Sequence, residues 1–436
     1  MLRAVSLFSN CGAGDYGYRE AGFDFKVCAE LEPRRADVCS LNHPNAEVII
    51  GDLRESWSEV VSSYKKKFGN KSLDLLTACP PCQGLSSARG KRGFYKDGKS
   101  GIKDPRNLLI TIVENVVNKL EPKIIVIENV PQFLYRRIID PDTGQELSAA
   151  NLIIRRLGKE YDAYPILVDL KDYEVPQYRK RTFITLIRKE LECNQVLSKI
   201  GSFPFPVPEY GNVDTSKNDE GVTVRSALQA LGAPRLSSKT ANQSSKTDFH
   251  PLHFVSVWER NKYEMIKAIP RFSGKSAWEN NRCSNCNHKS ENVDVYCTNC
   301  GEELKKPITE EANGNRRLIR GFSTSYKRMH SERPASTILT ASGHISSHST
   351  IHPYEHRTLS PLECQYLQTF PLDYDWGDTL DKYGPTSIRE MIGEAIPPLF
   401  TKKHGLILKE IIKGKYPKMI SNVDRRIIDA KRNLKK

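Results

Sequence analysis

The chain has 436 residues, enough for two or three domains with a sizeable core, and 38% of them are hydrophobic while 27% are charged. No apolar run reaches the ~18 residues that a membrane helix needs, and the apolar N-terminus is too short for a signal peptide, so we expect an intracellular protein. The net charge of +14 favours nucleic acid as a partner, because Lys and Arg displace the counterions of phosphates. An ordinary basic surface is the alternative.

The N-terminal part of the chain, 1–190, alternates short apolar runs with helical patterns. Strands are predicted at 3–8, 25–30, 47–50, 73–78, 123–128, 164–170 and 181–187, and helices at 16–21, 33–42, 55–67, 107–120 and 149–159. This alternation is typical of an α/β fold with a doubly wound, Rossmann-like, mostly parallel sheet. Ligands of such sheets bind at the carboxyl ends of the strands.

A glycine-containing turn, FSNCGAG at 8–14, links the first strand to the first helix. Gly12 and Gly14 allow backbone amides to approach a ligand at the helix N-terminus, and Asn10 tolerates a positive φ. Glu30 and Asp52, after the next two strands, are placed to accept ribose hydroxyls and an adenine amino group. A plain tight turn and ordinary helix caps are the alternatives.

Cys82 follows the fourth strand and the rigid pair Pro80-Pro81. Glu128-Asn129 ends the fifth strand, and Arg179 and Arg181 precede the last one. A nucleophilic cysteine needs a positive charge, a helix N-terminus or a base beside it, and a glutamate buried at a strand end has a raised pKa that suits proton donation. Each pattern alone is commonly a turn or a salt-bridged strand, but their combination indicates catalysis.

The region 191–350 is irregular and contains two polar stretches, so we expect a separate domain there. Within it, Cys283-x-x-Cys286 and Cys297-x-x-Cys300 have the spacing of a zinc ribbon near 281–302, with Gly301 relieving the second turn. A disulfide pair fits an intracellular chain poorly. His288 is a competing ligand that four cysteines make unnecessary.

Five motifs in this order resemble those of the cytosine-5 DNA methyltransferase family: FSNCGAG at 8–14, ACPPCQG at 78–84, ENV at 128–130, QYRKR at 177–181 and GEAIPP at 393–398. The resemblance covers roughly 1–190 and 353–413. It implies transfer of a methyl group from S-adenosylmethionine to carbon 5 of cytosine in sequence-specific duplex DNA, by covalent addition of Cys82 to a flipped-out base. Transfer RNA is an alternative substrate, because one branch of the family modifies it.

The resemblance also implies the site residues. The catalytic group consists of Cys82, Glu128, Asn129, Arg179 and Arg181. The cofactor group consists of Phe8, Asn10, Cys11, Gly12, Gly14, Glu30, Leu31, Asp52, Leu53, Pro80, Glu394 and Ile396, and the structural zinc ligands are the four cysteines above. Ser6 stands where Asp is frequent in the family, and Glu394 where Asn is common. The basic, glycine-rich segment 83–106 is expected to close over the flipped nucleotide.

The expected domains are a catalytic domain at 1–190 that 385–413 completes, a target-recognition domain at 191–350, a hinge at 351–384 and a basic tail at 414–436. The tail is expected to be an amphipathic helix or partly disordered. We expect a monomeric prokaryotic enzyme of the cytoplasm and nucleoid, with a cognate restriction endonuclease as a further partner.

Three other classes of protein fit these motifs less well. A thioredoxin-like pair at Cys79 and Cys82 leaves Glu128 and the arginines without a role. A nicotinamide dehydrogenase does not need Cys82. A DNA-binding module without activity does not need the intact pair of Cys82 and Glu128.

Overall fold

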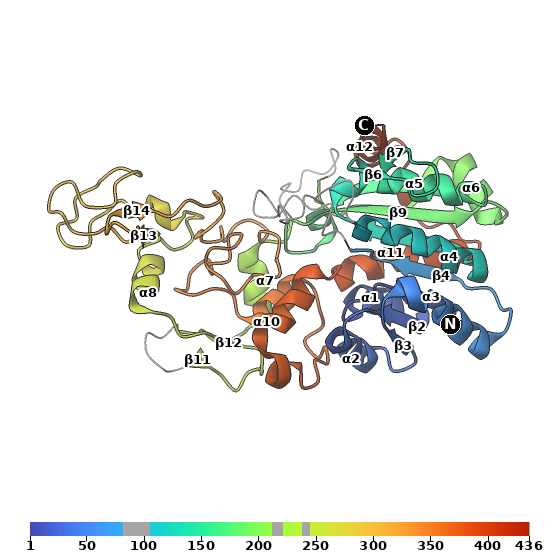
Figure 1. Ribbon diagram of the computed structural model, residues 1–436, viewed down its shortest axis with the longest axis horizontal. Coiled ribbons are helices and arrows are strands. Elements are labelled where there is room, and N and C mark those ends of the chain that lie inside the picture. Colours follow the sequence, from blue (N-terminus) through green and yellow to red (C-terminus); the bar gives the residue numbers. More distant parts are fainter. Residues whose placement is uncertain (82–104, 212–220, 238–244, 436) are drawn as a thin grey trace.

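The computed structural model describes residues 1–81, 105–211, 221–237 and 245–435, and it shows a large lobe from which a smaller, irregular lobe projects (Figure 1). The large lobe is built on seven strands: β1 (Leu2–Leu7), β2 (Phe23–Glu30), β3 (Glu47–Ile50), β4 (Leu75–Ala78), β5 (Ile124–Asn129), β8 (Tyr161–Asp169) and β9 (Lys180–Arg188). Their order is β3-β2-β1-β4-β5-β9-β8, and only β9 runs antiparallel to its neighbours. The predicted doubly wound, mostly parallel α/β fold is confirmed.

Helices cover both faces of this sheet. α3 (Leu53–Phe68), α4 (Ile110–Leu120) and α5 (Ala149–Leu157) pack on one face, and α1 (Ala13–Ala21) and α11 (Pro398–Ile412) pack on the other. α2 (Pro33–Asn42) lies beside β2 and β3. β5, with the sequence IIVIEN, is buried along its whole length, as expected for a strand covered on both sides. The helices and strands predicted in 1–190 agree closely with these bounds.

α11, which begins within the C-terminal motif, packs against α1 near the start of the chain. Gly17 of α1 and Gly405 of α11 each face the other helix. A Cβ at Gly17 would lie 2.1 Å from the carbonyl oxygen of Pro398, and a Cβ at Gly405 would lie 2.8 Å from Cβ of Ala21. The two helices therefore approach closely because both carry glycine at the crossing. Tyr18 and His404 join them by a buried hydrogen bond of 2.9 Å.

Two segments belong to the large lobe although the sequence pattern places them elsewhere. α6 (Glu192–Ile200) and β10 (Ser202–Pro206), expected in the second domain, pack on the sheet through the buried Phe203 and Phe205. β15 (Met419–Ser421) pairs with β10, and α12 (Arg425–Leu434) buries Ile427 and Ala430. The basic tail is thus an amphipathic helix that packs against the large lobe. No local pattern indicates this, because the contacts join segments that are far apart along the chain.

The smaller lobe contains short elements joined by long irregular segments: α7 (Val224–Leu231), β11 (Ser245–Lys246), β12 (Phe254–Val255), α8 (Arg260–Lys267), β13 (Ile308–Glu310) and β14 (Arg316–Leu318). α9 (Pro361–Leu367) and α10 (Thr379–Glu394) connect it to the large lobe (Figure 1). β6 (Arg137–Ile139) and β7 (Glu146–Ser148) form an antiparallel hairpin on the large lobe. None of the described helices combines the length and the apolar character needed to cross a membrane.

Candidate active site and metal centre

A pocket opens at the carboxyl ends of β1, β4 and β5, where the sheet meets the segment between α10 and α11. It encloses about 480 Å³, part of which is open to solvent. Its walls combine residues of both predicted groups, including Phe8, Asn10, Gly14, Glu128 and Ile396. Five of the twelve predicted cofactor residues (Phe8, Asn10, Gly14, Glu394 and Ile396) therefore line the same cavity as the predicted acid, Glu128.

The glycine turn between β1 and α1 has an uncommon backbone conformation. Phe8, Asn10 and Gly12 have φ values of 59°, 51° and 82°. Asn10 therefore adopts the positive φ that was predicted to be tolerable, and Phe8 shares it although it is neither Gly nor Asn. Gly12 is required, because a Cβ there would lie 2.6 Å from Cδ2 of the buried His43. Backbone outliers of this kind concentrate at ligand sites.

Glu30 fixes this turn from the neighbouring strand. Its Oε2 accepts a hydrogen bond from the backbone N–H of Asn10 at 2.8 Å, and its Oε1 accepts one from the backbone N–H of Glu32 at 3.1 Å. The carboxylate is buried, yet each oxygen retains a lone pair for a ligand hydroxyl. Glu30 thus orders the turn and remains able to accept from a ribose.

Four other residues of the predicted cofactor group differ in their placement. Asp52 caps α3 by accepting the backbone N–H of Arg54 at 2.9 Å, and it also pairs with the Arg54 side chain. Leu31 is exposed, whereas Leu53 is buried in the core. The Cys11 side chain is fully buried among residues of α9 and α10, so only its backbone remains available to a ligand.

Glu128, Arg181 and Asn129 lie together at the end of β5. Nε of Arg181 is 2.9 Å from Oε1 of Glu128. Burial raises the pKa of Glu128, while the positive charges of Arg181 and Arg179 act in the opposite direction. The side-chain amide of Asn129 donates to the carbonyl oxygen of Pro80 at 3.0 Å, which ties β5 to the segment that leads into position 82.

Cys82 and the segment 83–104 lie outside the described residues, and this segment includes most of the expected closing segment. The neighbouring Cys79 is described: burial, and then the negative charges of Glu128 and Asp15, raise the pKa of its thiol well above the ordinary value. Cys79 is therefore a poor candidate for a thiolate nucleophile or a reactive redox thiol.

Arg179, just before β9, and Arg181, within β9, have different surroundings although they are only two residues apart. The Arg179 guanidinium is fully buried and donates to the carbonyl oxygens of Ile338, Gly393 and Ala395 at 3.2, 2.9 and 2.8 Å. It thereby joins the strand to the segment 393–398. The resemblance assigns both arginines to the catalytic group; in the structure, Arg179 contacts the segment 393–398, and Arg181 faces Glu128.

The segment 393–398 closes one side of the pocket. Glu394 lines the cavity and forms an ion pair of 2.7 Å with Arg35 of α2. Burial raises the pKa of Glu394, against the effect of Arg35. Gly393 admits no side chain, because a Cβ would lie 2.4 Å from the backbone nitrogen of Thr340.

Three further pocket residues form a polar cluster that the sequence did not predict. Asp15 of α1 accepts hydrogen bonds from the hydroxyls of Ser6 at 2.6 Å and Thr77 at 2.9 Å, and all three line the cavity. The sequence contained two features that could have indicated this cluster: an acid directly after Gly14 and a serine in the first strand. Neither residue is informative until the fold brings them together.

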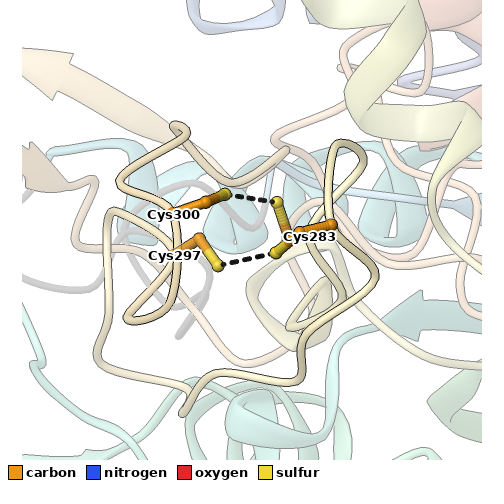
Figure 2. Close-up of side chains that lie close together, drawn as sticks. Cys283, Cys297 and Cys300 are labelled. Carbon is orange, nitrogen blue, oxygen red and sulfur yellow. Dashed lines mark hydrogen bonds between the residues drawn. The ribbon is translucent and has the colours of Figure 1, made fainter.

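The four cysteines of the predicted ribbon converge in the smaller lobe (Figure 2). Their sulfur atoms all lie within 4.8 Å of one another, with 3.5 Å between Cys283 and Cys300 and 3.6 Å between Cys286 and Cys297. These separations exceed the ~2.05 Å of a disulfide, and four Zn–S bonds of ~2.3 Å place tetrahedral ligands about 3.8 Å apart. The cluster therefore fits a zinc ion.

The two cysteine turns have matching backbones. Gly301, which was predicted to relieve the second turn, has a positive φ of 75°, and Asn287 takes the equivalent place in the first turn with a φ of 59°. The backbone N–H of His288 lowers the pKa of the Cys286 thiol to about 6. The imidazole of His288 contacts the hydroxyl of Thr298 at 3.0 Å instead of joining the sulfur cluster.

Comparison with known proteins places this site in context. The family model for C-5 cytosine-specific DNA methylases matches residues 2–413. The chain is 29% identical over 407 residues to the type II methyltransferase M1.HgaI of Avibacterium volantium, covering 91% of this chain and 95% of that protein. It is 34% identical over 217 residues to the type II methyltransferase M.AquIA of Picosynechococcus, covering 48% and 77%.

A solved structure shares the fold. It belongs to an Escherichia coli prophage protein described as a DNA modification methyltransferase, and it aligns with a TM-score of 0.55 at 20% identity, covering 95% of this chain and all of that one.

Proposed function

Because the chain belongs to the C-5 cytosine-specific DNA methylase family, it is a DNA cytosine-5-methyltransferase, and we propose that it acts by covalent addition of Cys82 to a cytosine turned out of the duplex. Carbon 5 of cytosine is too weak a nucleophile to take a methyl group directly. Addition of the Cys82 thiolate to carbon 6 forms a C–S bond and moves an electron pair toward carbon 5. Loss of the carbon 5 proton after methylation then breaks the C–S bond and returns the thiolate.

The observation that carries this proposal is the grouping of Glu128, Arg181 and Asn129 beside Pro80. As charge develops on the ring, a protonated Glu128 holds its proton against ring nitrogen 3. Arg181 donates a hydrogen bond to the exocyclic oxygen of the base and holds the Glu128 side chain in position. Asn129 fixes the chain just before Cys82.

The same pocket suits S-adenosylmethionine, which supplies the electrophilic methyl group when it is bound. Phe8 offers an aromatic face for the adenine, Glu30 accepts the ribose hydroxyls, and the bare Gly14 leaves room against Ile396. Asp52, Leu31 and Leu53 are assigned to the adenine end. These assignments imply that Asp52 exchanges its Arg54 contact for the adenine amino group.

We assign structural zinc to Cys283, Cys286, Cys297 and Cys300, and DNA recognition to the lobe that contains them. Basic residues near the cluster are partly neutralised: Arg316 pairs with Glu310 at 3.3 Å, and Arg317 pairs with Glu311 at 2.7 Å. The relatives named as type II methyltransferases support a role in restriction and modification, with a cognate endonuclease as partner.

We propose that 1–206 and 385–435 form the catalytic domain, that 207–350 recognises DNA, and that 351–384 is the hinge between them.

Replacing the nucleophile tests the mechanism. Cys82→Ser is expected to abolish methyl transfer to duplex DNA while leaving the affinity for S-adenosylmethionine within about threefold, because the thiol has no binding role. Transfer is measured with labelled cofactor, and affinity by calorimetry, with Cys193→Ser on α6 as the control.

A duplex carrying 5-fluorocytosine provides the direct readout, because fluorine cannot leave as the proton does. Mass spectrometry should find the trapped DNA on residue 82. Methyl transfer without such an adduct contradicts the proposal, and transfer to transfer RNA but not to duplex DNA contradicts the substrate.

A further inference from the structure

One acidic residue of the pocket plays no part in the mechanism above. Asp15 lies in the first turn of α1, and its carboxylate reaches across to the ends of β1 and β4, where Oδ2 meets Ser6 at 2.6 Å and Oδ1 meets Thr77 at 2.9 Å. Only 5% of Asp15 is exposed, yet it lines the cavity. Two neutral hydroxyls thus hold a buried carboxylate in the wall of the pocket.

Asp15 lacks the basic partner that two other acids lining the pocket, Glu128 and Glu394, possess. Glu128 pairs with Arg181 at 2.9 Å, and Glu394 pairs with Arg35 at 2.7 Å. Among the residues that the structure describes, no Lys, Arg or His pairs with Asp15, and only the Ser6 and Thr77 hydroxyls favour its charged form. Burial consequently raises its pKa to about 6.

A buried carboxylate without a counter-charge is costly, since its solvation is lost and no cation replaces it. The cost is removed when a ligand brings a positive charge into the cavity. S-adenosylmethionine carries two such charges, the sulfonium and the ammonium, and both belong to its methionine half. The adenosine half carries none.

We propose that Asp15, oriented by Ser6 and Thr77, is the counter-charge for the methionine half of the cofactor. This inference rests on the assignment of the pocket to S-adenosylmethionine. The carboxylate of Asp15 reaches the end of β1 from the adjoining helix, α1. In this chain the serine serves as a hydrogen-bond donor to that acid.

The test compares three ligands by calorimetry on the full chain. S-adenosylmethionine has both positive charges, S-adenosylhomocysteine retains only the ammonium, and methylthioadenosine has neither. Asp15→Asn keeps the shape of the side chain and removes its charge. Glu20→Gln, on the exposed side of the same helix, is the matched control.

Asp15→Asn is expected to weaken binding of S-adenosylmethionine about 10- to 100-fold, the range for a hydrogen bond to a charged group, and to leave methylthioadenosine within about twofold. An equal loss for S-adenosylhomocysteine assigns the contact to the ammonium, and a smaller loss assigns it to the sulfonium. Glu20→Gln should change none of the three affinities. If Asp15→Asn does not fold, Asp15→Ser provides the same comparison.

Two results overturn the inference: unchanged affinity for S-adenosylmethionine, or an equal loss for all three ligands, which indicates a general disturbance of the turn. A failure of the unmodified protein to bind any of the three overturns the cofactor assignment itself. The two proposals therefore fail in distinguishable ways.

Discussion

At the scale of single residues, the Glu128–Arg181 pair sets the protonation of the site. Burial favours the neutral acid, and the adjacent guanidinium favours the carboxylate, with burial prevailing. The protonated form therefore persists to higher pH than in an exposed glutamate. Because the proposed working form is the protonated acid, the rate should fall as the pH rises through the pKa of Glu128.

Glu128→Gln is expected to slow methyl transfer by about 10²- to 10⁴-fold, the usual contribution of a general acid, and to remove this falling limb from the pH profile. Arg181→Gln removes the nearest positive charge, so the pKa of Glu128 rises further and the limb moves to higher pH. Single-turnover rates across the neutral range and on either side of it measure both effects. Arg188→Gln, at the other end of β9, should leave the limb in place, and an unmoved limb in Arg181→Gln would contradict the assignment.

At the scale of elements, the crossing of α1 and α11 holds the pocket together. α1 begins at the glycine turn, and α11 begins at Pro398, the last residue of the segment 393–398, so their contact fixes the distance between two walls of the cavity. The crossing depends on Gly17 and Gly405, because the helices leave no room for a Cβ at either position.

Gly17→Ala is expected to lower the free energy of unfolding by about 1–3 kcal/mol, because the new methyl group overlaps backbone atoms that cannot move independently. Urea denaturation measures this change. Affinity for S-adenosylmethionine should fall as well, since the two walls separate. Glu20→Ala, exposed on the same helix, should stay within about 0.5 kcal/mol of the original protein. If Gly17→Ala is as stable as this control, the two helices are packed less closely than the distances at Gly17 indicate.

At the scale of the whole molecule, the strand ends that form the pocket and the segment 283–300 that carries the cysteine cluster lie in different lobes (Figure 1). Near the cluster the core is small, consisting of Cys283, Cys297 and Leu304. Because burial of so little apolar surface offsets little of the entropy lost in ordering the surrounding chain, we expect the proposed zinc ion to stabilise this region. The large lobe has extensive cores on both faces of its sheet, so we expect its stability not to depend on zinc.

Removal of zinc by a chelator is therefore expected to weaken duplex DNA binding by about tenfold or more, the scale of a lost specific contact, before it alters cofactor affinity. Elemental analysis should find one zinc per chain, and fluorescence anisotropy at fixed ionic strength measures the DNA affinity. Cys297→Ser should reproduce the effect, whereas Cys193→Ser should not. Parallel loss of DNA and cofactor binding would contradict the independence of the two lobes.

The sequence by itself determined the elements and the local motifs. Strands such as β5 follow from uninterrupted apolar runs, and the positive φ values of Asn10 and Gly301 follow from residues that adopt this conformation readily. The convergence of four cysteines follows from their spacing. These features depend on residues that are close along the chain, so their physical causes can be recognised in a short stretch of sequence.

Only the tertiary structure decided how distant residues are used. It buried Arg179 against the carbonyl groups of Ile338 and of the segment 393–398, and it turned Ser6 and Thr77 toward Asp15. It also attached β15 and α12 to the large lobe. Such outcomes depend on which segments the packing of the core brings together, and the local pattern around each of these residues is compatible with several partners. The chemistry of a side chain is fixed by its type, but its role depends on the neighbours that the folded core provides.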